Sequence, residues 1–206
     1  MMVSNVGQRL ALFAWGVFAM AAMSAVTHAA EEKVPVVFSG GHETDRQDHG
    51  RPVVLIAAAL GVKPEVFREA FSGVTPARGR GPTGEEARKN KAALMKVLQP
   101  YGITNDRLDE VSNYYRYQPQ RSELWTNKAA KAHAIIVDGK VKEIVVTEPG
   151  AGYSTPPKAT LKGMETADLQ ATLHFGKDLK TNGSIRRVDV GDPSSEKTPQ
   201  RLSPSK

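Results

Sequence analysis

The 206-residue chain contains no cysteine. Disulfide bonds, a cysteine nucleophile and lipid attachment to an N-terminal cysteine are therefore excluded, and the fold must be held by its core. The sequence also lacks a Gly-x-Ser-x-Gly elbow, a His-Glu-x-x-His motif and a nucleotide-type phosphate loop. Because every enzyme signature is missing or incomplete, the sequence favours a binding or structural role over catalysis.

A hydrophobic run long enough to span a membrane is also missing. The uncharged apolar run at residues 10–23 is shorter than the roughly 20 residues that a transmembrane helix needs. It follows the single charge of Arg9 and precedes the small-residue stretch 24–30. This layout is typical of a secretory signal peptide covering residues 1–29, with cleavage after Ala29. We therefore expect a periplasmic or secreted protein; a retained membrane anchor is the alternative.

Acidic residues are fewer than basic ones, and the formal net charge is +6 at pH 7. Loss of the predicted signal peptide would remove one positive charge, Arg9. A modest basic excess suits anionic polymers of the cell envelope, although it also serves solubility alone. Export argues against DNA or RNA as a partner.

Helical patterns occupy the first half of the expected mature chain. We predict a helical domain at 40–117 that begins with a His/Asp-rich loop and contains about four short helices. Their signals are Pro52 with Gly61, Pro64 with Gly73, a capping box at Thr83–Glu86, and Thr104 as an N-cap with Ile103 and Leu108 as a hydrophobic staple.

The periodicity changes from 3.6 residues to two residues near Ala132. Two alternating segments flank Asp138-Gly139, a strong hairpin signal, and Asn182-Gly183 is a second turn signal. These patterns predict a small antiparallel β-domain at 132–190, after a linker at 118–131. The predicted fold class is thus α+β, with the helices first and the small sheet after them.

Two flanking segments complete the expected organisation. Residues 30–39 contain a short β-like run interrupted by Pro35, which restricts it to an edge strand or an extended arm. Residues 191–206 consist largely of proline, serine and charged residues, a composition that predicts a disordered tail.

The loop at 40–51 gathers histidines and carboxylates. Zinc, iron and manganese accept such nitrogen and oxygen ligands, and the candidate ligands are His42, Asp45, Asp48 and His49, with Glu43 as a further carboxylate. The alternative is structural: Asp48 or His49 caps the helix that starts near Pro52, and Arg46 and Arg51 pair with the other acids. The sequence leaves both open.

An aromatic group follows the predicted helices. Tyr114, Tyr117 and Trp125 are candidate ligand-binding residues, because aromatic rings stack on sugars. The alternative is that these rings seal the contact between the two domains.

Two segments resemble known classes of protein. Residues 135–161, with the hairpin, the Pro149–Tyr153 turn and the Thr155-Pro156-Pro157 exit, resemble small glycine-tyrosine β-modules of bacterial surface and phage structural proteins. This resemblance implies a scaffold or an adhesive unit without chemistry of its own. Residues 38–117 resemble exported bacterial proteins of unknown function, a resemblance that implies no catalytic residues.

Together these patterns predict an exported, non-catalytic binding or structural module of the bacterial cell envelope. Its expected partner is an anionic envelope polymer or another envelope protein. The alternative is a metal-dependent, hydrolytic protein that uses the loop from His42 to His49.

Overall fold

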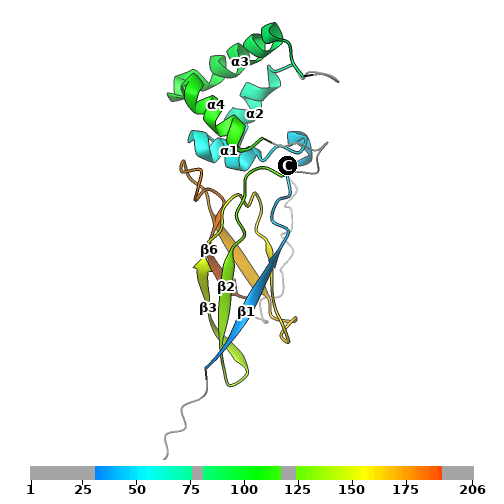
Figure 1. Cartoon of the computed structure of the whole chain (residues 1–206), viewed down its shortest axis with the longest axis vertical. Coiled ribbons are helices and arrows are strands. Elements are labelled where there is room, and N and C mark those ends of the chain that lie inside the picture. The colour runs from blue at the N-terminus through cyan, green and yellow to red at the C-terminus, as the bar shows by residue number, and fades with distance from the viewer. Residues whose placement is uncertain (1–30, 76–80, 117–123, 192–206) are drawn as a thin grey trace, which may run out of the picture.

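The computed structural model describes residues 31–75, 81–116 and 124–191. Within these ranges the chain forms four α-helices and one six-stranded antiparallel sheet, so the α+β class is confirmed. The helices lie together at one end of the elongated sheet (Figure 1). The predicted signal peptide, Tyr117 and residues 192–206 of the predicted tail lie outside the described residues.

The four predicted helices are present. They are α1 (Val53–Leu60), α2 (Pro64–Ser72), α3 (Gly84–Leu98) and α4 (Asn105–Tyr114). The capping box of α3 is formed: the Glu86 amide donates to Thr83 Oγ1 at 3.2 Å, and the Thr83 amide donates to Glu86 Oε2 at 2.7 Å. Thr104 caps α4 through one bond, in which its Oγ1 accepts from the Arg107 amide at 3.2 Å. Among the described residues, no helix has both the length and the apolar character that crossing a membrane requires.

The six strands form one continuous sheet. They are β1 (Glu32–Ser39), β2 (Lys131–Val137), β3 (Lys140–Glu148), β4 (Lys158–Leu161), β5 (Leu169–His174) and β6 (Ser184–Val190), in the order β3-β2-β1-β4-β5-β6. Asp138 and Gly139 connect β2 to β3 with φ of 51° and 72°. Positive φ at both central residues is the geometry of a two-residue hairpin, so the predicted hairpin is confirmed.

The prediction of a small sheet that follows the helices needs correction. The sheet includes β1, which precedes the helices in the chain, and its edge strands β3 and β6 contact each other, so the sheet is nearly closed. β1 lies inside the sheet, between β2 and β4, and is not an edge or an arm. Pro35 is tolerated because β4 pairs only with Val36–Ser39, which leaves β1 with a neighbour on one side at the proline.

Two apolar clusters form the core. One fills the interior of the curled sheet and includes Val36, Ala134 and Leu161. The other lies among the helices and includes Leu55, Phe67 and Val111. Because every strand pair is antiparallel, alternate connections of the sheet return to the helical end. We call the contact between these connections and the helices the seam, formed by residues 40–45, 125–130, 149–155 and 175–183.

Asn182 is the buried polar centre of the seam, with a relative exposure of 0%. Its Nδ2 donates to Leu55 O of α1 at 2.8 Å and to Tyr115 Oη, just after α4, at 2.9 Å. Its Oδ1 accepts from the Gly176 amide at 3.1 Å. The predicted turn at Asn182-Gly183 is present, and the asparagine also joins the helices to the sheet.

Candidate functional site

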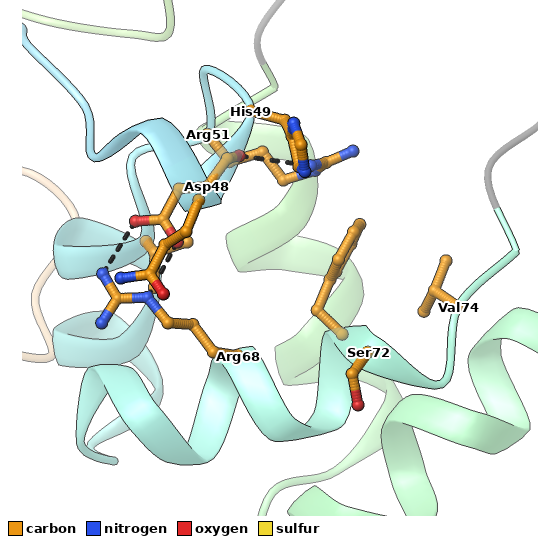
Figure 2. Close-up of a pocket in the computed structure, with 9 residues that line it drawn as sticks. Asp48, His49, Arg51, Arg68, Ser72 and Val74 are labelled. Carbon is orange, nitrogen blue, oxygen red and sulfur yellow. Dashed lines mark hydrogen bonds and ion pairs between the residues drawn. The ribbon is translucent and has the colours of Figure 1, made fainter.

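A cavity of about 370 Å³ opens where the loop after β1 meets α2. Its lining comes from loop residues 47–49 and 51, from Val53 at the start of α1, from Arg68, Phe71 and Ser72 of α2, and from Val74. Figure 2 shows these side chains facing one another from the two sides of the cavity. We call this space the Arg51 cavity. Concave sites that combine apolar walls with a few convergent polar groups are typical binding sites.

A buried ion pair fixes the wall of the cavity. Both carboxylate oxygens of Asp48 accept hydrogen bonds from Arg68, each at 2.8 Å (Figure 2). The Asp48 side chain is only 3% exposed, and its hydrogen bond to Arg68 raises the pKa of that guanidinium. Such a two-bond contact holds both partners in one orientation. The pair therefore anchors the loop to α2, and the Asp48 carboxylate neutralises the charge of Arg68.

Arg51 differs from Arg68 in its partners. Its guanidinium lies 4.0 Å from the centre of the Phe71 ring. Within the described residues it makes a single hydrogen bond, from Nη1 to Asp48 O at 3.3 Å, and no ion pair. Burial lowers the pKa of Arg51, and the nearby Asp48 charge opposes that effect. The cavity thus contains a partly buried cation that lacks an anionic partner within the described structure.

A second cavity of about 360 Å³ is also lined by the ion pair. It shares Asp48, Arg51 and Arg68 with the first, and Ser154 and Thr155 form part of its wall. The loop after β1 is tied to this wall, because Ser154 Oγ donates to Glu43 O at 2.7 Å and Thr155 Oγ1 donates to Glu43 Oε2. The Asp48–Arg68 pair therefore belongs to the walls of both cavities.

The structure separates the predicted metal ligands. His42 lies in the seam, where its ring stacks on Tyr153 with centroids 5.1 Å apart. Asp45 is exposed and accepts from the Gln47 amide at 3.0 Å, Asp48 is paired with Arg68, and His49 is exposed at the rim of the Arg51 cavity. Residues 31–75, 81–116 and 124–191 contain no group of three or more such side chains arranged to hold a metal ion.

The structural alternative for this loop also differs in detail. The residue that caps α1 is Pro52, which offers no side-chain hydrogen bond. Asp45 instead caps the 3₁₀ turn Arg46–Asp48. Neither Arg46 nor Arg51 pairs with Glu43 or Asp45 within the described part of the chain.

Trp125 and Tyr115 are buried, and Tyr114 is partly buried. Trp125 is 2% exposed, and its Nε1 donates to Gly152 O at 2.8 Å. Tyr114 packs edge-on against Tyr115, with centroids 5.0 Å apart, and burial raises the pKa of the Tyr114 hydroxyl. Tyr117 lies outside the described residues. The arrangement of Trp125 and Tyr115 matches the alternative in which the rings seal the contact between helices and sheet.

The sequence does not indicate the residues that build the cavity. Its local pattern predicts Arg51 only as a partner for nearby acids and assigns Phe71 no role in a site. The stacking of Arg51 on Phe71 joins residues twenty positions apart, and no local pattern indicates it.

These features define an α+β protein in which a curled sheet carries a helical cap with an amphipathic cavity. Comparison with known protein families, with curated proteins and with solved structures found no significant match. The cavity is therefore the feature of the molecule from which a function is proposed.

Proposed function

We propose that the protein is an exported, non-catalytic binding module of the bacterial cell envelope. The curled sheet serves as its scaffold, and the helical cap holds a group of the partner in the Arg51 cavity. The observation that carries the proposal is this cavity of about 370 Å³, whose wall is fixed by the Asp48–Arg68 pair. A wall already ordered before binding reduces the entropy lost when a ligand enters.

Two polar groups of the cavity, Ser72 and Asp48, are held in contacts that suit a binding wall more than chemistry. Ser72 Oγ donates to Glu69 O at 2.7 Å, so its hydroxyl proton is directed to the backbone of its own helix and not to a base. The carboxylate of Asp48 accepts hydrogen bonds from Nε and Nη2 of Arg68. A general base must be within reach of a proton to remove it, and these groups are already engaged.

Sedimentation of the purified exported protein with isolated cell-wall material tests the proposal. We expect retention in low salt and release at moderate salt, since exposed charges are screened there. Val74→Trp, which adds a large ring at the cavity wall, should weaken retention by about tenfold, or about 1.4 kcal/mol. Val37→Trp is the matched control, because Val37 is 56% exposed on β1, away from the cavity.

Two results would contradict the proposal. One is the absence of retention at any salt concentration. The other is equal retention of wild type and Val74→Trp, which would mean that contact with the wall material does not use the cavity. A thermal melt of both tryptophan variants is needed first, to confirm that each remains folded at the assay temperature.

A further inference from the structure

The two arginines of the Arg51 cavity differ in whether a carboxylate neutralises their charge. Arg68 is neutralised by the buried Asp48 at 2.8 Å. Arg51 is partly buried and has no ion pair within the described residues. A partly desolvated charge is costly unless it is paired and hydrogen-bonded. An anion that enters the cavity would supply both the missing charge and the missing acceptors.

The donors of Arg51 are also mostly unused. A guanidinium has five N–H donors in a fixed planar fork, and only Nη1 makes a hydrogen bond, to Asp48 O, in the described structure. The stacking on Phe71 at 4.0 Å holds the plane of this fork in position. This arrangement suits an oxyanion, which a planar fork can bind through two parallel hydrogen bonds.

Apolar side chains also line the cavity. They are Phe71 and Val74, which are both partly buried, and the more deeply buried Val53. Apolar lining favours a ligand that brings hydrocarbon surface with it, at about 25 cal/mol for each Å² removed from water. A small inorganic anion would meet the guanidinium but leave this apolar lining uncovered.

We infer that the Arg51 cavity binds an organic anion, with its carboxylate or phosphate group on Arg51 and its apolar body against Phe71, Val53 and Val74. This inference rests on the proposed binding function and names the chemistry of the group that enters the cavity. Arg51 is the residue that recognises the charge, and Arg68 and Asp48 position the loop that carries it. Both kinds of oxyanion occur in envelope polymers, so the test must separate them.

Isothermal titration calorimetry of the purified exported protein with four probes provides that test. The probes are phenylacetate, phenyl phosphate, the neutral phenylacetamide and inorganic phosphate. We expect at least one of the two organic anions to bind at least tenfold more tightly than the neutral amide and than inorganic phosphate. The stronger of the two assigns the oxyanion as carboxylate or as phosphate.

Three variants connect the binding to Arg51. Arg51→Met keeps an apolar contact with Phe71 and removes the charge, so it should lose at least tenfold in affinity for the organic anions and leave the weak binding of phenylacetamide unchanged. Arg51→Lys keeps the charge without the planar fork and should be intermediate. Arg46→Gln removes a charge from an exposed arginine of the same loop, outside the cavity lining, and should bind as wild type.

Clear results would overturn the inference. Equal affinity for phenylacetate, phenyl phosphate and phenylacetamide would show that the charge is not recognised, and full binding by Arg51→Met would place any anion elsewhere. Binding of neither organic anion would also refute it. If Val74→Trp still reduces retention on cell-wall material in that case, the proposed binding function stands and only the anion chemistry fails. If an organic anion binds but the protein is not retained on cell-wall material, the anion chemistry stands and the proposed binding function fails.

Discussion

Replacement of Asn182 by alanine should destabilise the whole protein, because one side chain joins the helices to the sheet. The variant loses two donor bonds, to Leu55 O and Tyr115 Oη, and one acceptor bond, from the Gly176 amide. A net contribution of about 1 kcal/mol for each bond gives a cost of about 3 kcal/mol. Folded domains have free energies of unfolding of only about 5–15 kcal/mol, so this loss is a large share.

Urea denaturation measures the effect. With a slope of about 1–3 kcal/mol per M, a loss of about 3 kcal/mol lowers the midpoint by about 1–3 M. Asn113→Ala is the matched control, since Asn113 is exposed and, among the described residues, its side chain bonds only to Arg116. Its effect should stay within about 0.5 kcal/mol. Combining Asn182→Ala with Tyr115→Phe should cost less than the sum of the two, because both remove the same bond.

A cost below about 1 kcal/mol for Asn182→Ala would refute this reasoning, since surface substitutions produce changes of similar size. Full additivity with Tyr115→Phe would show that the Nδ2–Oη contact at 2.9 Å contributes nothing measurable.

Further predictions concern the ion pair, a histidine and processing. Asp48→Asn should cost about 3 kcal/mol in urea denaturation, the lower end of the range for breaking a buried pair, because the Arg68 side chain is 27% exposed; an unchanged midpoint would contradict a structural role. Burial lowers the pKa of His42 below 6.5, so the unfolded chain binds its proton more readily, and stability should fall as the pH drops through about 6.5. His42→Phe should remove that part of the pH dependence, and an identical pH profile would contradict the assignment. Mass spectrometry of the exported protein should show a chain beginning at Ala30 or Glu31; an intact N-terminus in a membrane fraction would overturn the signal-peptide prediction.

Local signals predicted the helices well. The capping box at Thr83 and the N-cap at Thr104 act within one turn of chain, so a single sequence contains all the information they need. The Asp138-Gly139 hairpin is local in the same sense. The sheet order is different, because β1 pairs with segments far along the chain, and Pro35 wrongly indicated an edge or an arm.

The sequence drew attention to the loop at 40–51 but did not indicate the contacts that shape the cavities. The loop at 40–51 does line both cavities, but the side chains that shape them are paired over distance: Asp48 with Arg68, and Arg51 with Phe71. The histidines and carboxylates of the loop show which types of metal ligand are present. Their order along the chain does not show in which directions the side chains point. Their directions follow from the seam, which holds His42 against Tyr153, and from the 3₁₀ turn, which buries Asp48.

The position of β1 has a consequence for the order in which the protein folds. Val36 pairs with Ala132 on one side and with Leu161 on the other, so the chain must close loops of roughly a hundred residues before the middle of the sheet exists. Contacts of such long range form late. For a chain that emerges from its N-terminus, β1 is the first strand to appear and one of the last to find its neighbours. Until then β1 is an unpaired segment with exposed apolar side chains. A chaperone would need to shield it from other chains.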